Sequence, residues 1–301
     1  MDRLQQMQVF IAVAEEQGFA AAARRLNQSA PMVTRAVAGL ESHLGVKLLN
    51  RTTRTVRTTE AGERYLEDAR RILADLQAAD EAAAGLNAEP RGLLAVTAPV
   101  LFGRRYVVPG IVEFLERYPD MRVDSVFLDR TVNLLEEGLD VGIRIGELPD
   151  SSMRALRVGT VRRVLVAAPG YLDRRGAPSS PHELGLHTVI ASSAGNFSAS
   201  WRFHSAEGEL AVRIRPRLTV TTNDAAIEAA CEGFGITRLL SYQAATALAD
   251  GRLVTLLEAF EPPALPVHVI HRSGPTSASK VRAFIDLIAA RLRADTTLNP
   301  E

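Results

Sequence analysis

The sequence predicts an α/β protein in three parts: a small helical part, one long helix, and a larger part in which strands alternate with helices. Of the 15 prolines, only Pro31 precedes residue 90, so the first 89 residues should be mostly helical. Residues 60–87 contain no proline and repeat apolar side chains at intervals of three and four, as one long helix does. From residue 93 onward, short apolar runs alternate with amphipathic segments, which is typical of a sheet covered by helices.

The composition is that of an ordinary globular protein. Hydrophobic residues make up 47% and charged residues 23% of the 301, a length that suits two or three domains. The balance of 35 basic against 35 acidic residues argues against a wholly basic nucleic-acid coat. The one cysteine, Cys231, cannot form an internal disulfide, and no apolar stretch is long enough for a membrane span. We therefore expect a cytoplasmic protein with no membrane partner.

The zero net charge is a cancellation of unlike segments. Residues 24–57 contain seven bases and one acid, whereas residues 60–89 contain eight acids and three bases. Residues 90–301 are close to neutral. Positive charge is thus concentrated in the N-terminal helical part, where phosphates of a nucleic acid could lie.

Three short helices are predicted before residue 45. They span residues 4–14, 20–26 and 29–44, with Ser29 as the cap of the third helix and Gly45 at its end. The third helix turns Val33, Val37 and Leu40 toward a core and presents short polar side chains and an arginine on its other face. Two helices joined by a short turn in this way are the layout of a DNA-binding helix-turn-helix, although all-helical enzymes also contain it.

A pair of short strands follows the third helix. Residues 47–49 and 55–58 read as strands around a basic tip, Arg51 to Arg54, which makes a plausible wing. The excess positive charge lies on the third helix, its neighbour and this wing. That distribution favours DNA binding over an enzyme, because a merely solvated helix face more often mixes signs.

Four stretches carry a family resemblance: FAAAARRL at 19–26, SAPMVTR at 29–35, LESHLGVKLLNRT at 40–52 and TEAG at 59–62. With this spacing, the N-terminal part resembles the winged helix-turn-helix of LysR-type transcriptional regulators. The resemblance extends more loosely over essentially the whole chain. It implies a regulator that binds double-stranded DNA at an interrupted palindrome, with RNA polymerase as a candidate partner.

The resemblance also implies which side chains contact DNA. The expected contacts are Ser29, Ala30, Pro31, Met32, Thr34 and Arg35 on the recognition helix, and Arg51, Arg54 and Arg57 on the wing. Many family members have a glutamine where Ala30 stands. An alanine there leaves only an apolar contact to a thymine methyl group.

The long helix carries an uninterrupted heptad seam. Its members are Tyr65, Ala69, Ile72, Leu76, Ala79, Ala83 and Leu86. A helix of this length, on the order of 40 Å, needs a partner along its narrow apolar side. The partner is either the body of its own chain or a second subunit. The resemblance implies the second, an antiparallel pairing of two linker helices in a homodimer, or in a dimer of dimers.

The C-terminal part should form two lobes. Strands are expected at residues 93–97, 122–127, 140–145, 163–167, 236–240 and 267–271, and helices at 102–117, 132–137, 223–232, 242–249 and 280–293. The first run, βαβαβ, predicts a parallel sheet with helices on both faces. Two such lobes linked by crossing strands make a hinged, periplasmic-binding-protein-like domain. We expect a DNA-binding domain at 1–59, a linker helix at 60–89 and a regulatory domain at 90–301, with lobe I at about 90–161 and 267–301 and lobe II at about 162–266.

No enzyme motif stands out in the C-terminal part. Gly233 and Gly235 begin a dinucleotide fingerprint, but Arg238 stands where its third glycine is needed. His268 and His271 would point to opposite faces of a strand, so we expect no metal site and no cofactor. We expect a non-enzyme. The alternative is an α/β ligand-binding or catalytic protein that uses its winged domain only for assembly.

A ligand cleft is expected at the carboxyl ends of the strands. The candidate effector-binding residues are Thr97, Ala98, Pro99, Val100, Arg144, Asn196, Phe197, Thr221, Thr222 and Asn223. A helix N-terminus and a guanidinium favour a small anionic effector. The resemblance implies that this effector lies between the lobes, with Ala98 replacing a hydroxyl residue that is common in the family. Arg144 could instead form a surface ion pair, and Asn223 could be an ordinary helix cap.

Overall fold

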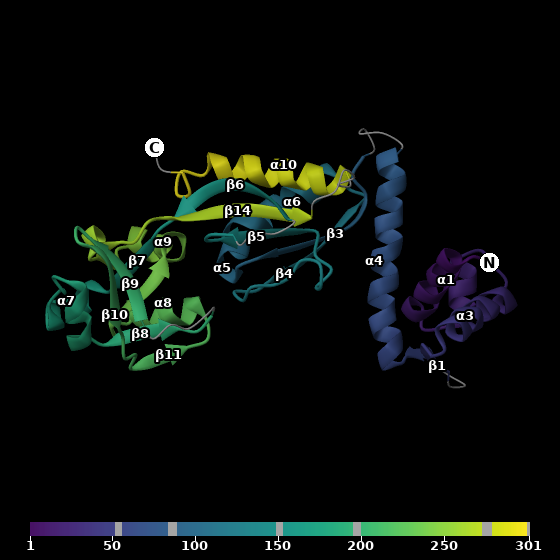
Figure 1. Cartoon of the computed structure of the whole chain (residues 1–301), viewed down its shortest axis with the longest axis horizontal. Helices are drawn as coiled ribbons and strands as arrows, with labels where there is room; N and C mark the ends of the chain where they lie inside the picture. The colour runs from purple at the N-terminus through teal and green to yellow at the C-terminus, as the bar shows by residue number, and fades with distance from the viewer. Residues whose placement is uncertain (52–55, 84–88, 149–152, 195–199, 273–278, 300–301) are drawn as a thin grey trace. The chain divides into compact units, whose positions relative to one another are not determined.

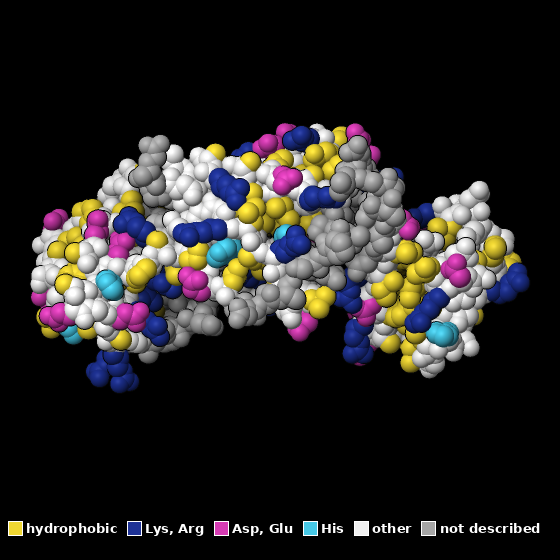
Figure 2. All heavy atoms as spheres, turned by 45° about the horizontal axis from the view of Figure 1, so that its top comes forward, with side chains coloured by type: hydrophobic (Ala, Val, Ile, Leu, Met, Phe, Trp, Pro, Cys, Tyr) yellow, Lys and Arg dark blue, Asp and Glu magenta, His cyan; other side chains and the backbone are white. Residues whose placement is uncertain are grey.

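The structure is a computed structural model that describes residues 1–51, 56–83, 89–148, 153–194, 200–272 and 279–299. The chain divides into two compact units, Met1–Ala88 and Glu89–Glu301. Each unit is built around its own buried apolar core. Figure 1 shows the order of the elements, and Figure 2 shows basic and acidic side chains interspersed over the larger unit, in keeping with its nearly neutral sequence.

Unit 1 confirms the predicted winged helix-turn-helix. Its elements are α1 (Arg3–Glu15), α2 (Phe19–Arg25), α3 (Ala30–Leu44), the strands β1 (Leu49–Arg51) and β2 (Val56–Thr58), and α4 (Glu60–Ala83). The strands pair antiparallel to form the base of the wing. Buried apolar side chains of the first three helices, among them Phe10, Val33, Val37 and Leu40, form the core beneath them.

A close backbone approach joins the wing to the long helix α4. A Cβ added to Gly62 would lie 2.0 Å from the carbonyl oxygen of Leu48, so only glycine fits there. Thr59 fixes the same junction, because its hydroxyl donates to the carbonyl oxygen of Lys47 at 2.7 Å and accepts from the amide of Gly62 at 2.9 Å. The stretch TEAG at 59–62 therefore sets where α4 starts relative to the wing.

Lobe I of unit 2 is a five-stranded sheet in the order β4-β3-β5-β14-β6. Its elements are β3 (Gly92–Ala98), α5 (Val100–Phe102), a π-helical turn η1 (Gly103–Val107), α6 (Val108–Arg117), β4 (Met121–Phe127), β5 (Val141–Ile145), β6 (Met153–Val161), β14 (Leu265–Arg272) and α10 (Ser279–Ala294). Strands β4, β3 and β5 are parallel as predicted, whereas β14 runs antiparallel to both of its neighbours, β5 and β6. The sheet is therefore mixed.

Two predictions for lobe I are wrong. Residues 132–137 form turns rather than a helix, because the side chain of Asn133 accepts from the amide of Leu135 at 3.0 Å in a local turn. The α5–α6 segment and α10 pack on one face of the sheet (Figure 1), while the other face buries Val132, Leu134 and Leu139 of this turn region. Helices thus do not cover both faces.

Lobe II is a second mixed sheet, in the order β11-β8-β12-β7-β13. Its elements are β7 (Arg163–Ala167), α7 (Pro169–Arg175), η2 (Pro181–Leu186), β8 (Val189–Ser192), the hairpin β9 (Ser200–Ser205) and β10 (Gly208–Arg213), β11 (Leu218–Val220), α8 (Asn223–Cys231), β12 (Ile236–Leu240), α9 (Ser241–Ala249), β13 (Val254–Leu256) and η3 (Glu258–Phe260). Helices α8 and α9 pack on one face, while α7 and the hairpin pack on the other.

The chain crosses between the lobes twice. It leaves lobe I at the end of β6 and enters β7 through Arg162, and it returns from η3 through residues 261–264 into β14. Two mixed sheets joined by two crossings confirm the predicted periplasmic-binding-protein-like architecture. The sequence did not reveal β6, α7, β8, the β9–β10 hairpin, β11 or β13.

Candidate functional site

The N-terminal half of α3 presents an exposed polar and apolar face. Ser29 occupies the cap position, as predicted, but its side chain makes no capping hydrogen bond. Ala30, Pro31, Met32 and Arg35 are exposed, and Thr34 is half-buried. The Arg35 side chain makes only a long hydrogen bond of 3.4 Å, from Nε to the carbonyl oxygen of Pro31. These side chains are available to an external partner.

A buried carboxylate ties α3 to the wing. Glu41 is 4% exposed, and its Oε1 accepts from the amides of Leu48 and Leu49 at 3.0 and 3.2 Å. Its Oε2 accepts from Nζ of Lys47 at 2.7 Å. Burial by itself would raise the pKa of Glu41, but the ammonium and the two amides outweigh it and leave the pKa lowered. Glu41 is thus a charged anchor that fixes β1 against α3.

Part of the positive charge that the sequence assigns to DNA is neutralised within unit 1. Lys47 pairs with Glu41, and Arg25 pairs with Glu15 at 2.7 Å. Among the described side chains, Arg24, Arg35 and Arg57 are exposed and have no ion pair. Arg51 lies in β1, and Arg54 lies outside the described residues. The basic surface is therefore smaller than the count of seven bases suggests, and it is limited to α2, α3 and the wing.

The first part of the predicted seam on α4 packs against its own subunit. The ring of Tyr65 lies 5.8 Å from that of Phe10 of α1, and Arg70 pairs with Glu15 of α1 at 2.6 Å. Ala69 is fully buried within the subunit, so it offers no surface to a partner, and its assignment to dimerisation is wrong.

Further along α4, large apolar side chains of the seam are exposed. Ile72 and Leu76 are each 40% exposed, which is high for large apolar side chains. Ala79 and Ala83 belong to α4, and Leu86 lies outside the described residues. The unpaired apolar surface therefore begins near residue 72.

The predicted effector residues at the end of β3 lie at or below the surface of lobe I. Thr97 and Ala98 are fully buried, and the Oγ1 of Thr97 has no hydrogen-bond partner among the described residues. Pro99 caps α5, and Val100, its first residue, is exposed. The amide of Val100 donates to Oδ1 of Asp129 at 3.0 Å. A carboxylate of the protein itself thus lies where an anionic ligand was expected.

Asp129 links the two lobes. It follows β4, and its Oδ2 accepts from Nδ2 of Asn223 in α8 at 3.5 Å. Burial raises the pKa of Asp129, the amide of Val100 lowers it, and the negative charge of Asp224 raises it further, with a net rise. The sequence reasoning missed Asp129, although its place just beyond the end of a parallel strand could have identified it.

Arg144 is held by backbone rather than by an acid. Its Nη2 donates to the carbonyl oxygen of Val132 at 2.9 Å and its Nη1 to that of Ile143 at 3.3 Å. Burial lowers its pKa. The structure therefore does not show Arg144 in the alternative arrangement, a surface ion pair.

Thr222, not Asn223, caps α8, since its Oγ1 accepts from the amide of Ala225 at 3.4 Å. Thr221 is exposed beside it. Asn196 and Phe197 lie outside the described residues. Val100 and Asn223, predicted from distant parts of the sequence, are brought together through Asp129.

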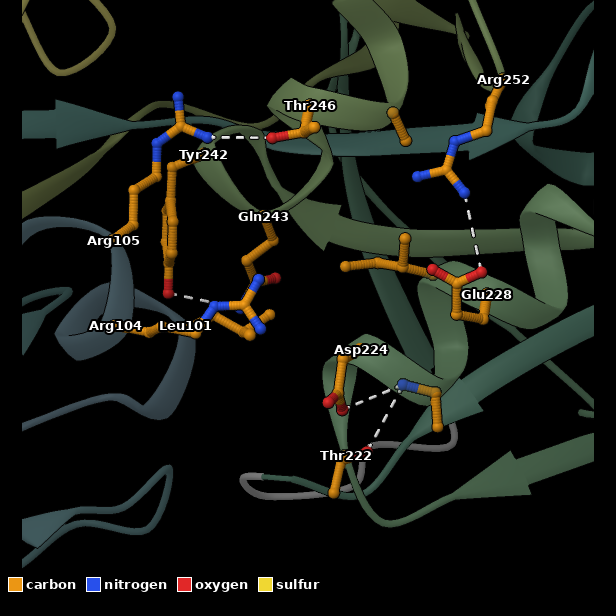
Figure 3. A pocket seen from close by; sticks show the side chains of 13 residues that line it. Leu101, Arg104, Arg105, Thr222, Asp224, Glu228, Tyr242, Gln243, Thr246 and Arg252 are labelled. Atoms are coloured by element: carbon orange, nitrogen blue, oxygen red, sulfur yellow. Dashed lines mark hydrogen bonds and ion pairs between the residues drawn. The ribbon is translucent and has the colours of Figure 1, made fainter. Parts of the chain in front are cut away.

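A cavity of about 670 Å³ opens between the turn after β3 and helices α8 and α9 (Figure 3). Of the predicted effector residues, only Thr222 lines it. Arg104 and Arg105 come from η1, and Arg105 donates to the hydroxyl of Thr246 at 3.3 Å, while Arg252 pairs with Glu228 at 3.6 Å. The phenol of Tyr242, whose pKa burial raises, lies beside Arg104 and Arg105 (Figure 3). The mixture of charges suits a polar ligand.

No described helix has the length and apolar character to cross a membrane. In the same residues, no cluster of three or more His, Cys, Asp or Glu side chains could hold a metal ion.

Known proteins match most of the chain. Residues 87–293 match the family described as "LysR substrate binding domain", and residues 4–63 match "Bacterial regulatory helix-turn-helix protein, lysR family". The chain is 31% identical to the HTH-type transcriptional regulator CrgA of Neisseria meningitidis serogroup B, over 96% of each chain. It is 31% identical to the HTH-type transcriptional regulator DmlR of Escherichia coli, over 95% of this chain and 93% of DmlR.

Solved structures give the same result. The structure of CrgA matches with a TM-score of 0.62 at 31% identity and covers 96% of this chain and 98% of its own. The full-length structure of the Vibrio cholerae virulence activator AphB also matches with a TM-score of 0.62, at 26% identity, over 96% of this chain and 99% of AphB.

Proposed function

The chain belongs to the LysR family of bacterial helix-turn-helix regulators, and from this premise we propose that it is a transcription regulator that binds specific DNA through α3 and the wing. The observation that carries the proposal is the exposed face of α3 around Thr34 and Arg35, together with the exposed Arg24 and Arg57, which form no ion pair among the described residues. We assign residues 1–59 to DNA binding, 60–89 to the linker helix and 90–301 to regulation. We assign the protein no catalytic activity.

Each DNA contact has a chemical role in this proposal. Arg35 can donate two parallel hydrogen bonds to a guanine, and Ser29 and Thr34 can contact bases or phosphates through their hydroxyls. Ala30, Pro31 and Met32 supply apolar contacts such as those to thymine methyl groups. Arg51, Arg54 and Arg57 bind phosphates or lie in the minor groove beside the wing.

We propose that two chains pair through α4. The exposed Ile72 and Leu76, continued by Ala79, Ala83 and Leu86, supply the apolar surface. A symmetric pair presents two α3 helices to two half-sites, which explains the choice of an interrupted palindrome. A dimer of dimers would extend the same arrangement. Since the target is chromosomal DNA, we place the action in the cytoplasm, with RNA polymerase as a candidate partner.

The effector of the C-terminal unit is proposed to be a small organic anion. An anion between the lobes can compete with Asp129 for the amide of Val100 and can break the contact of Asp129 with Asn223. Thr97, Ala98, Pro99 and Arg144 of lobe I, and Thr221 and Thr222 of lobe II, remain the proposed lining, together with Asn196 and Phe197. Closure or opening of the lobes around this contact would then change the geometry of the bound DNA.

Titration of DNA binding against salt tests the proposal. The full chain should bind duplex DNA with an affinity that falls steeply as salt rises, and Arg57→Ala should reduce the slope by about 1. Arg117→Ala, the same charge change in unit 2, is the matched control and should leave the slope unchanged. A chain that fails to bind DNA under all these conditions, yet binds a small molecule, would favour the alternative in which the winged domain serves assembly only.

A further inference from the structure

Three arginines of lobe II converge on one face of its sheet. Arg163 begins β7 and Arg238 lies in β12, and the antiparallel register places Leu240 opposite Arg163 and Leu165 opposite Arg238. Because side chains alternate along a strand, the two arginines share a face, two positions apart. Arg202 comes from β9 of the hairpin, which packs on that face through Trp201 and Phe203.

The three arginines line a single cavity of about 440 Å³. The cavity is also lined by Glu147, which follows β5, by Pro262, Pro263 and Ala264 of the second crossing, and by Leu265 of β14. Arg163 directly follows the first crossing. The cavity therefore lies where both crossings between the lobes meet lobe II. None of the residues proposed to bind the effector lines it.

The guanidinium groups of this cluster have no acidic or hydrogen-bonding partner among the described residues. Arg238 lies 5.0 Å from the ring of Trp201, and none of the three arginine side chains has a hydrogen bond or ion pair within the described parts of the chain. Burial and, to a smaller extent, the positive charge of Arg163 together lower the pKa of Arg238 to about 10. Burial and the charge of Arg202 likewise lower the pKa of Arg163.

The acids near the cluster form no ion pair with its three arginines among the described residues. Glu261 is held by Arg162 at 3.0 Å, and Glu147 and Glu209 line the cavity without an ion pair to the three arginines in the described structure. The like charges of the three arginines repel one another, and the donors of the half-buried Arg163 and Arg238 lose water without gaining acceptors. Such a cluster becomes favourable when an anion with several oxygens lies between its members.

We propose that Arg163, Arg202 and Arg238 form a second anion site, which binds a small molecule carrying a phosphate or carboxylate group at the hinge of the regulatory unit. Planar guanidinium groups match both kinds of oxyanion through paired hydrogen bonds. The aromatic ring of Trp201 attracts the guanidinium group of Arg238 by a cation–π interaction and holds it in place. Because Arg163 directly follows the first crossing and residues of the second crossing line the cavity, an anion bound there lies against the segments about which the lobes rotate. The site does not depend on the assignment of the effector.

Trp201 is the chain's only tryptophan, so its fluorescence reports directly on this site. Inorganic phosphate is titrated into the full chain, with the ionic strength held constant by sodium chloride, and succinate is titrated in parallel. We expect a saturable change in Trp201 emission. If only phosphate changes the emission, the site binds phosphates. If only succinate changes it, the site binds carboxylates. The proposal is overturned if neither anion gives a saturable change in emission. It is also overturned if sodium chloride at the same ionic strength gives the same change.

Two variants separate binding from folding. Arg163→Gln should weaken anion binding at least tenfold, while its melting temperature without anion should equal or exceed that of the wild type, since a like charge is removed. Arg217→Gln, the same charge change at an exposed arginine over Phe234 in the same lobe, should leave the affinity within twofold. If Arg163→Gln fails to fold, Arg202→Gln serves instead, because its side chain is exposed. Wild-type affinity in the folded variant contradicts the site.

Discussion

Removal of the buried carboxylate of Glu41 should detach the wing from the recognition helix. In Glu41→Ala, the amides of Leu48 and Leu49 lose their acceptor, which costs about 1 to 3 kcal/mol for each buried donor. The contact with Lys47 adds little, because the Lys47 side chain is 76% exposed. Water entering the vacated space satisfies part of the loss, so we expect the opening free energy of the wing to fall by about 2 to 4 kcal/mol. Glu41→Gln keeps one acceptor oxygen and should lose less.

Hydrogen–deuterium exchange of the full chain measures this effect locally. A loss of 2 to 4 kcal/mol corresponds to roughly 30- to 700-fold faster exchange of the amides of Leu48 and Leu49. Ser42→Ala, at the next and exposed position of α3, is the matched control and should change neither rate. Equal exchange in wild type and Glu41→Ala would refute the anchoring role, as would equal effects of the alanine and glutamine variants.

The same contact predicts a pH dependence. The pKa of Glu41 is lowered in the folded protein from its ordinary value of 4.5. The carboxylate therefore contributes its full stabilisation above pH 4.5, and this contribution is lost as the pH falls through the lowered folded pKa. The difference in wing exchange between wild type and Glu41→Gln should accordingly shrink on acidification below pH 4.5. A difference that grows instead would contradict this reasoning.

Three further predictions follow from other parts of the chain. Arg35→Ala should weaken binding to the specific DNA site by about 1 to 3 kcal/mol, measured by fluorescence anisotropy, and unchanged affinity for that site would exclude base reading by Arg35. Ile72→Asp combined with Leu76→Asp should halve the sedimenting mass, because both side chains are 40% exposed in the subunit; an unchanged mass would reject pairing through α4. Asp129→Asn should raise the melting temperature by about 1 to 3 °C at pH 7, because burial raises the pKa of this acid and its charge therefore opposes folding. That gain should vanish below pH 3.8, where the wild-type carboxyl is protonated too, and a lower melting temperature at pH 7 would refute it.

Local patterns in the sequence were enough to predict unit 1. Its helices are short, their apolar spacing is regular, and Gly45 ends α3 in the left-handed conformation that glycine favours. The same local reasoning failed at residues 132–137, where apolar and acidic side chains at helical spacing form turns over the sheet. There Asn133 offers the backbone a turn in place of a helix.

The site in unit 2 depends on contacts between distant segments, which spacing does not reveal. Asp129 and Asn223 meet only because two lobes face each other, and Arg163 and Arg238 become neighbours only through an antiparallel pairing that a βαβ pattern does not predict. Ala69 shows a different error, because the seam assigned it to the contact between subunits and it is buried within one subunit. A heptad seam identifies apolar positions, but it does not distinguish those covered by the same subunit from those left for a second one.

Capture of genomic DNA tests the central claim most directly. The full chain and Arg35→Ala are each incubated at about 0.15 M salt with sheared DNA of the source organism, and the retained fragments are sequenced. The account predicts that the wild-type chain enriches a few fragments sharing an interrupted inverted repeat, and that Arg35→Ala loses this enrichment while it still retains bulk DNA at low salt. Retention of bulk DNA without enrichment, equal in the two proteins, would contradict specific reading by α3.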